Sequence, residues 1–408
     1  VIVDFIGSTS DGFSISGNYY HLKGLDIRKA GHNGINISGN NNIIENCVTQ
    51  NCGNTGLHLT GSTAPGPSNN LILNCDSFYN FDSPIGGNAD GFSAKWSVGS
   101  GNIFRGCRSY NNSDDGWDLW MCTGSITIDS CYAFRNGIDI WFTGQFDGNG
   151  NGFKLGGNRV ATPHTVTNCV AFDNAGNGGK GFDENNNLAG QTIYNCTSFR
   201  NKNYNFALYN DPLTSGTHTI KNCLSYLPGK ADVIKNATQE KNSWQGFTLS
   251  ASDFRNTDTT GFIAPRDAKG RIPSSLFLRI NTGSLLIDGG VNVGIPFTGS
   301  APDLGAFEYS ATAETNPIFN TTNLVINNYP NPFYSKTTIE YQLIEKSRVF
   351  VSVCNNVGTI VASYSYESLN PDTYRLTLDS KDWTQGLYFY TINTGVAKFT
   401  GKMIKIGQ

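Results

Sequence analysis

A short pattern recurs through the first half of the chain: a glycine, a large apolar residue, a variable residue and usually a second apolar residue. The first two intervals between copies are 22 residues each, and the later intervals are longer. A fixed minimum with variable excess is typical of a solenoid, because each coil repeats one unit and insertions collect at its turns. The copies are Gly12-Phe-Ser-Ile15, Gly34-Ile-Asn-Ile37, Gly56-Leu-His-Leu59, Gly91-Phe-Ser-Ala94, Gly116-Trp-Asp-Leu119, Gly152-Phe-Lys-Leu155, Gly181-Phe-Asp-Glu184 and, degenerately, Asn205-Phe-Ala-Leu208.

A second pattern, a cysteine followed by an aromatic residue and an asparagine, accompanies most copies of the first. Alternating residues mark a short strand, and asparagine favours the turn after it and can bond to the asparagine of the next coil. Ten cysteines leave a disulfide framework open, but their regular recurrence favours a column of reduced, buried thiols. Both patterns predict an all-β protein, a right-handed parallel β-helix. Clear copies begin at Cys75, Cys131, Cys169 and Cys196.

Beyond about residue 225 the repeat fades. Residues 242–309 are predicted to finish and cap the C-terminal end of the solenoid, since an open end would expose strand edges and core. Long alternating strands such as Thr337–Leu343 and Gly386–Ile392 then predict a small antiparallel β-sandwich. We therefore expect a β-helix over residues 1–309, a linker over 310–323 and a β-sandwich over 324–408.

Charge and termini narrow the class of protein. The net charge of −3 gives no general attraction for nucleic acid, so a polyanionic partner must be held by local cations or a bound metal ion. No stretch approaches the roughly 20 apolar residues that span a bilayer. The chain begins at Val1, inside the repeat, which we interpret as a mature or trimmed product that lacks its first coils.

Four aspartates are predicted to converge on one face of the solenoid. Neighbouring parallel strands lie about 4.8 Å apart, so aligning the glycines places Asp90 beside Asp115, with Asp114 adjacent, and Asp118 beside Lys154. Asp114 and Asp115 could simply form a turn, yet their register with Asp90 favours a metal site. Calcium takes six to eight oxygen ligands and would relieve the repulsion between these carboxylates.

Other outward-facing side chains lie near this cluster. Lys95 and Trp120 are predicted to point outward two positions further along their strands, and with Asn151 they are predicted to bind substrate. The alternative for Trp120 is packing against an inserted loop. Lys154 lies between Asp118 and Asp183, which would raise its pKa, whereas a nearby calcium ion would lower it.

Residues 1–309 resemble polysaccharide lyase family 9, through Asn88-Ala-Asp-Gly-Phe92, Cys107-Arg-Ser-Tyr-Asn-Asn-Ser-Asp-Asp-Gly-Trp-Asp118 and Asn151-Gly-Phe-Lys-Leu-Gly-Gly157. This resemblance implies a pectate lyase-like enzyme, with Asp90, Asp114, Asp115 and Asp118 as ligands of calcium and Lys154 as the base. Residues from Leu324 resemble the C-terminal sorting domain of type IX secretion, through Asn328-Tyr-Pro-Asn-Pro-Phe333 and the terminal strands.

These resemblances imply a secreted or surface-attached monomer, exported from a Gram-negative cell by the type IX secretion machinery. The predicted reaction is calcium-dependent β-elimination on pectate, or polygalacturonate. Two alternatives stay open: a lyase for another acidic polysaccharide, and a surface β-helix that binds polysaccharide without cleaving it.

Overall fold

The computed structural model describes residues 1–209, 213–259, 262–267, 270, 272, 276–310, 327–343, 347–356, 359–370, 372–393 and 398–407. The chain divides into two compact units. The first comprises Val1–Asp258 and Ala264–Thr312, and the second comprises Ala313–Gln408 with the short segment Thr259–Ile263. The predicted linker, residues 310–323, lies outside the described residues except for Ser310.

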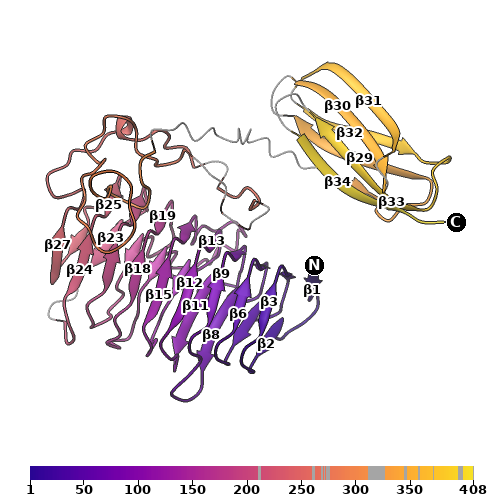
Figure 1. Cartoon of the computed structure of the whole chain (residues 1–408). Helices are drawn as coiled ribbons and strands as arrows, with labels where there is room; N and C mark the ends of the chain where they lie inside the picture. Colours follow the sequence, from indigo (N-terminus) through magenta and orange to yellow (C-terminus); the bar gives the residue numbers. More distant parts are fainter. Residues whose placement is uncertain are drawn as a thin grey trace. The chain divides into compact units, whose positions relative to one another are not determined.

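Three parallel sheets of nine strands each form the right-handed β-helix of the first unit (Figure 1). Sheet A contains β1 (Ile2–Asp4), β4 (Asp26–Arg28), β7 (Val48–Gln50), β10 (Asp76–Phe78), β13 (Arg108–Tyr110), β16 (Tyr132–Phe134), β19 (Val170–Phe172), β22 (Thr197–Phe199) and β25 (Leu224–Tyr226). Sheet B contains β2 (Phe13–Ile15), β5 (Ile35–Ile37), β8 (Leu57–Gly61), β11 (Phe92–Trp96), β14 (Trp117–Asp118), β17 (Phe153–Lys154), β20 (Phe182–Asp183), β23 (Phe206–Leu208) and β26 (Val233–Ile234). Sheet C contains β3 (His21–Lys23), β6 (Ile43–Glu45), β9 (Leu71–Leu73), β12 (Asn102–Arg105), β15 (Ile126–Asp129), β18 (Thr165–Thr167), β21 (Thr192–Tyr194), β24 (His218–Lys221) and β27 (Ala237–Glu240).

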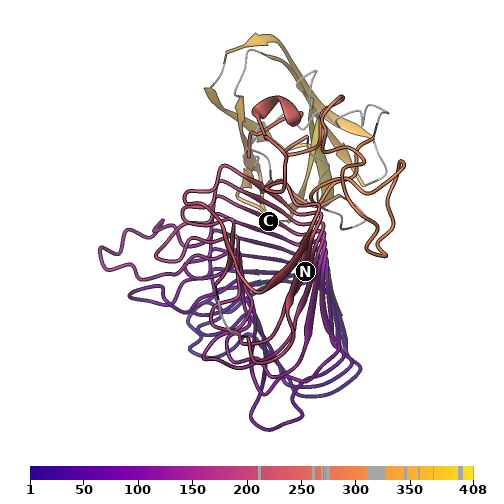
Figure 2. The same cartoon turned by 90° about the vertical axis from the view of Figure 1, so that its left-hand side faces the viewer.

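Each coil contributes one strand to each sheet. In the view of Figure 2, which looks along the stack, the coils lie one behind another. Each glycine of the repeated sequence pattern directly precedes a strand of sheet B. Their register is the predicted one, since Phe92 pairs with Trp117 and Trp117 pairs with Phe153. The predicted parallel β-helix is therefore confirmed, with the repeats aligned as the sequence suggested.

Inward-facing residues of the coils form stacked columns in the core. The rings of Phe92, Trp117, Phe153, Phe182 and Phe206 stack in sequence, with centroids 4.8 to 5.0 Å apart. The recurring cysteines form a second column, and all ten cysteines of the chain are free thiols. The structure therefore contains the predicted column of reduced cysteines and does not contain the alternative, a framework of disulfides.

A ladder of buried asparagines follows the sheet A strands, at the turn into sheet B. Each side-chain amide donates to the carbonyl of the next asparagine, over distances of 2.8 to 3.0 Å. The glycine column packs directly against this ladder, because a Cβ on Gly116 would lie 3.0 Å from Asn136 Nδ2 and 2.5 Å from the carbonyl oxygen of Gly152. The ladder runs through Asn80, Asn112, Asn136, Asn174 and Asn201.

The segment after the last coil differs from the prediction. Trp244 packs on Phe206 at the end of the solenoid, as a cap would. The rest of the segment, which includes a short 3-10 helix at Ala251–Asp253, folds back along sheet A. There Phe277 contacts the ring of Phe172 at 4.7 Å. Because the outer face of sheet A carries stacked aromatic rings, this segment buries apolar surface that water would otherwise contact.

A buried ion-pair group holds the returning segment to sheet A. Asp76 binds the Arg108 guanidinium at 2.6 Å and the Arg266 guanidinium at 2.7 Å, although Arg266 follows Asp76 by 190 residues. Arg108 also donates to the carbonyl oxygen of Ala264 at 2.8 Å. The segment was predicted to finish and cap the C-terminal end, and Trp244 does so, but the described residues around Arg266 and Phe277 instead cover a flank of the β-helix.

The second unit contains two antiparallel sheets. One consists of β28 (Asn327–Tyr329), β29 (Lys336–Leu343) and β32 (Asp372–Asp379), and the other of β31 (Ile360–Leu369), β30 (Ser347–Asn355), β33 (Gly386–Asn393) and β34 (Lys398–Lys405). Their apolar faces share one core that includes Ile339, Val351 and Ile392. Within the described part of the chain, no helix is long and apolar enough to cross a membrane.

Replacing Asn136 by alanine is expected to lower the free energy of unfolding by about 2 to 3 kcal/mol, since buried amide groups of Asn112 and Asn174 lose their partner. Chemical denaturation measures this change. Asn177→Ala is the control, because that exposed side chain bonds only to Asp147 Oδ1 in the described structure, and its loss should change stability by less than about 0.5 kcal/mol. Equal losses in both variants would contradict a stabilising ladder.

The native protein is expected to expose at most one reactive thiol, that of Cys354, because the other nine cysteines are buried. A colorimetric thiol titration should count one or fewer thiols before unfolding and all ten after it. Reductant should leave the melting temperature unchanged. Fewer than ten thiols in the unfolded, unreduced protein would show that disulfides form.

Candidate active site

The outer face of sheet B brings the predicted residues together. Asp118 on β14 pairs in register with Lys154 on β17, and Lys154 pairs with Asp183 on β20. On the other side, Asp118 pairs with Ser93 on β11. These neighbours are the ones predicted from the sequence, so alignment of the glycines places each strand residue correctly.

A second row lies at the turn before these strands, at the position that precedes each glycine. The backbone N–H of Gly56 donates to the carbonyl of Asp90, that of Gly91 to Asp115, and that of Gly116 to Asn151. Asp90, Asp115 and Asn151 are therefore successive members of one row. Asp114 is adjacent to this row, and its carboxylate lies beside that of Asp115.

Four carboxylates form one buried cluster: Asp90, Asp114, Asp115 and Asp118 each offer an oxygen, and these oxygens lie within 4.8 Å of one another. All four residues are at most 3% exposed. Calcium binds oxygen at about 2.3–2.6 Å, so two ligands on opposite sides of the ion are about 5 Å apart. The separation of the oxygens and the chemistry of the donors fit a calcium ion.

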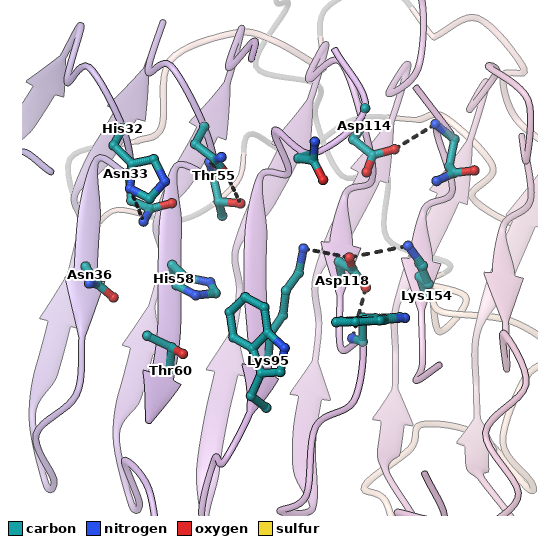
Figure 3. A pocket seen from close by; sticks show the side chains of 16 residues that line it. His32, Asn33, Asn36, Thr55, His58, Thr60, Lys95, Asp114, Asp118 and Lys154 are labelled. Carbon is teal, nitrogen blue, oxygen red and sulfur yellow. Dashed lines mark hydrogen bonds and ion pairs between the residues drawn. The ribbon is translucent and has the colours of Figure 1, made fainter. Parts of the chain in front are cut away.

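Two lysines point into the same cluster (Figure 3). Lys154 Nζ lies 2.9 Å from Asp115 Oδ2 and 3.3 Å from Asp118 Oδ2. Lys95 Nζ lies 2.9 Å from Asp90 Oδ2 and 2.7 Å from Asp118 Oδ2. Asp118 thus lies between two ammonium groups. When all four carboxylates are ionised, they outnumber the two ammonium groups by two, which matches the charge of one divalent cation.

Burial and charge perturb the acid groups of the cluster. Burial raises the pKa of Asp90 to about 7, against the opposing effect of the Lys95 ammonium. Burial and the neighbouring Asp115 carboxylate raise the pKa of Asp114 well above its usual range. Burial alone would raise the pKa of Asp118 too, but the ammonium groups of Lys154 and Lys95 lower it.

Lys154 is held in its charged form. Burial disfavours the ammonium, but the carboxylates of Asp115 and Asp118 outweigh burial and raise the pKa of Lys154 well above its usual value. The same balance raises the pKa of Lys95, which Asp118 and Asp90 stabilise as a cation. Both lysines are therefore protonated when no cation binds the carboxylates.

Backbone and side-chain donors fix the orientation of the carboxylates. Asp115 Oδ1 accepts a bond of 2.7 Å from the N–H of Asn151, and Asp114 Oδ1 accepts one of 2.7 Å from the N–H of Asn149. Thr55 Oγ1 donates to Asp90 Oδ2 at 3.1 Å. Sequence reasoning missed Thr55, although it precedes Gly56 and so belongs to the same row as Asp90.

Asp114 and Asp118 of the cluster, with Lys154, line an elongated groove of about 520 Å³ that runs across the strands of sheet B (Figure 3). From the carboxylate cluster the groove extends toward the N-terminal coils, where His58, Asn36 and His32 line it. His58 is buried and its Nδ1 lies 2.5 Å from Ser93 Oγ. Burial lowers the pKa of His58 to about 3, so this imidazole is neutral at physiological pH.

The three residues predicted to bind substrate have different surroundings. Lys95 reaches the carboxylates, which its position in the strand did not reveal. Trp120 lines the groove, where its ring meets that of Trp96 edge to face with a centroid distance of 6.1 Å and lies close over Gly157. Asn151 is buried, and its Oδ1 accepts a bond of 3.2 Å from the backbone N–H of Lys180. Substrate binding by these residues stays a prediction.

Comparison with known proteins identifies relatives for both units. Residues 1–258 match the family described as Pel9A-like, right handed beta helix region. Pectate lyase L of Dickeya chrysanthemi is 42% identical over 302 residues, which are 73% of this chain and 69% of that protein. Pectate lyase L of Paenibacillus polymyxa is 38% identical over 317 residues, covering 72% and 68% of the two chains.

Solved structures agree with these relatives. The crystal structure of pectate lyase Pel9A has a TM-score of 0.71 and 39% sequence identity, over 76% of this chain and 77% of that one. A rhamnogalacturonan lyase has a TM-score of 0.61 and 28% identity, over 70% and 77% of the two chains. A β-helix with this groove and these relatives is a polysaccharide lyase. More narrowly, the chain belongs to the Pel9A-like right-handed β-helix family.

The second unit has a different role. Residues 327–406 match the family described as secretion system C-terminal sorting domain. This domain directs secretion from a Gram-negative bacterium, with attachment to the cell surface or release. The predicted sorting domain is thereby confirmed.

Replacing Asp114 by asparagine should remove a calcium ligand while relieving carboxylate repulsion. Because burial and Asp115 raise the pKa of Asp114 in the fold, its charged form costs stability as the pH rises above the unfolded value. At neutral pH we expect the metal-free variant to be at least as stable as the wild type, and to bind calcium at least about tenfold more weakly. Thermal unfolding and calorimetric titration with calcium measure the two effects.

The control for this experiment is Asp147→Asn, which removes one exposed carboxylate outside the cluster. It should leave calcium affinity unchanged. Equal calcium affinity in Asp114→Asn and the wild type would contradict a ligand role for Asp114.

Proposed function

We propose that the protein is a calcium-dependent lyase that cleaves polygalacturonate, or pectate, by β-elimination, with Lys154 as the base. The observation that carries this proposal is the position of the Lys154 ammonium against Asp115 and Asp118, inside the four-carboxylate cluster on the floor of the groove. A metal site and an amine side by side meet the needs of this reaction. The relatives named pectate lyase L point to the same substrate.

Asp90, Asp114, Asp115 and Asp118 would hold the calcium ion. When bound, it would neutralise the carboxylate of a uronate residue, so that the proton on C5 becomes more acidic. The ionised carboxylates would repel an acidic substrate when no cation neutralises them. This repulsion supports calcium dependence, together with the needs of the reaction.

Lys154 accepts the C5 proton in the proposed reaction. The electron pair left on C5 forms a double bond to C4, and the oxygen on C4 leaves with the rest of the polysaccharide chain. For this step the amine must be neutral, whereas the ion pairs with Asp115 and Asp118 keep it protonated. Positive charge bound at these carboxylates offsets their effect on Lys154, so that metal binding and base function are coupled.

The remaining groove residues orient the polysaccharide. Trp120 and Trp96 present aromatic surface on which sugar rings can stack, and Lys95 presents an ammonium to an acidic sugar. Asn151 acts indirectly, because its backbone N–H donates to Asp115 Oδ1 and so positions that carboxylate. We expect the enzyme to act as a monomer, since every proposed site residue comes from one chain.

A second candidate function is a lyase for another acidic polysaccharide. The solved rhamnogalacturonan lyase, at 28% identity, supports this alternative, because the metal cluster and lysine constrain the chemistry more closely than the sugar. A non-catalytic polysaccharide-binding β-helix is the third. Substrate panels that include polygalacturonate, rhamnogalacturonan and other polyuronates separate the three.

Lys154→Ala is expected to lower the rate of cleavage of polygalacturonate by about 10²- to 10⁴-fold, the usual contribution of a general base. The variant should retain stabilisation by calcium, because the four carboxylates remain. Ultraviolet absorbance of the unsaturated product measures cleavage, and a chelator should abolish it in the wild type.

Lys221→Ala serves as the matched control, since this lysine forms an ion pair with Glu240 on sheet C, outside the groove. It should retain full activity. Undiminished activity of Lys154→Ala, or wild-type activity in the presence of chelator, would disprove the proposed mechanism.

A further inference from the structure

The row that precedes each glycine continues beyond the metal cluster. After Asp115 and Asn151, the N–H of Gly152 donates to the carbonyl of Lys180, and the N–H of Gly181 donates to the carbonyl of Tyr204. The row therefore changes from acidic to basic and aromatic within three coils. This change lies on the same face of sheet B, toward the C-terminal coils.

Four side chains form a connected group at this place, here called the lysine–tyrosine patch: Lys180, Tyr204, Tyr209 and Lys230. The Lys180 ammonium lies 5.0 Å from the ring centre of Tyr209, and the Lys230 ammonium lies 5.7 Å from that of Tyr204. The two tyrosine rings meet edge to face at 6.2 Å. These contacts hold two cations and two rings together, with Lys230 exposed and Lys180, Tyr204 and Tyr209 half-buried.

The patch is continuous with the proposed catalytic groove. Lys180 Nζ lies 2.8 Å from Asp183 Oδ2, and Asp183 is the register partner of Lys154 on the next strand. Tyr209 also donates to Asp183 Oδ1, at 3.4 Å. The surface beyond Lys154 therefore leads directly from the base to the patch.

Charge distinguishes the surfaces on the two sides of Lys154. Toward the N-terminal coils the groove presents His32, Asn36 and His58, and His58 is a neutral imidazole. Toward the C-terminal coils, beyond the end of the groove at Lys154, the surface carries two lysines, Lys180 and Lys230. Asp183 pairs with Lys180, but the structure, over its described residues, gives the Lys230 ammonium no carboxylate partner. An anionic polymer is thus attracted to the C-terminal side.

We propose that the lysine–tyrosine patch is a binding subsite for an acidic polysaccharide, and that the chain extends from Lys154 along the β-helix toward the C-terminal coils. Tyrosine rings offer stacking surface to sugars, and lysines offer charge to uronate carboxylates. The inference rests on the proposed lyase function for the reaction at Lys154. It adds the direction of the bound chain and the residues that recognise its distant sugars.

Binding can be measured without cleavage. Electrophoresis of Lys154→Ala through native gels containing polygalacturonate should show retardation that weakens as salt is added. Introducing Lys230→Gln and Tyr204→Ala into this background should reduce the retardation at least fivefold, expressed as an apparent dissociation constant. Lys221→Gln removes the same charge on sheet C and should leave the retardation unchanged.

Kinetics on oligogalacturonides of increasing length give a second readout in the catalytically active protein. In the wild type, kcat/KM should rise as added sugars reach the patch. In Lys230→Gln with Tyr204→Ala, this rise should stop at a shorter oligomer. Circular dichroism and the response of the melting temperature to calcium verify that the variant is folded.

Three results would overturn the subsite: unchanged retardation in the patch variant, equal loss in Lys221→Gln, or equal retardation in a gel containing a neutral polysaccharide. Failure of the proposed function has a separate signature. In that case the wild type forms no unsaturated product from polygalacturonate, whereas the gel assay still reports whether the patch binds acidic polymers.

Discussion

The close packing of the glycine column against the asparagine ladder is the contact on which the rest of the β-helix depends. Gly116 and Gly152 lie so near Asn136, Asn174 and the next coil that no side chain fits there. This packing sets the distance and register between coils at the turn into sheet B. The carboxylate cluster lies immediately beside that turn, so the same contact that fixes the fold also fixes Asp90 against Asp115.

The cluster itself works against the stability of the fold. Four buried carboxylates in one place repel one another, and burial raises the pKa of Asp90 to about 7. Lys95 and Lys154 relieve part of this repulsion. The remaining excess of negative charge is a reason for the site to bind a divalent cation, and stacked parallel strands are rigid enough to hold the carboxylates together until it does.

Periodicity explains which features could be predicted from the sequence. Asp118 and Lys154 were placed as neighbours because residues at equal distances from two aligned glycines must lie side by side in stacked coils. The same reasoning predicted the column of cysteines and the cluster of four aspartates, whereas alternating residues predicted the strands of the second unit. Each of these features repeats along the chain or has a register that can be counted.

Structural features that do not follow the sequence repeat could not be predicted from the sequence. The return of the segment around Arg266 and Phe277 along sheet A depends on contacts such as that of Arg266 with Asp76, which no sequence repeat predicts. Lys95 was placed correctly on its strand, but register locates only the Cβ atom. Its long side chain bends to Asp90 and Asp118, and this choice depends on the charges around it.

The stacked architecture also separates the chemistry from the length of the binding surface. The cluster and the lysine come from three consecutive sheet B strands, β11, β14 and β17 with their preceding turns, whereas the groove extends beyond them across the N-terminal coils, as far as Asn36 and His32. Gain or loss of a whole coil outside those three would lengthen or shorten the surface and leave the reacting groups in place. Duplication of a single repeat can therefore change the length of polymer that such a protein binds. No inactive variant needs to arise along the way, because the reacting groups stay in place.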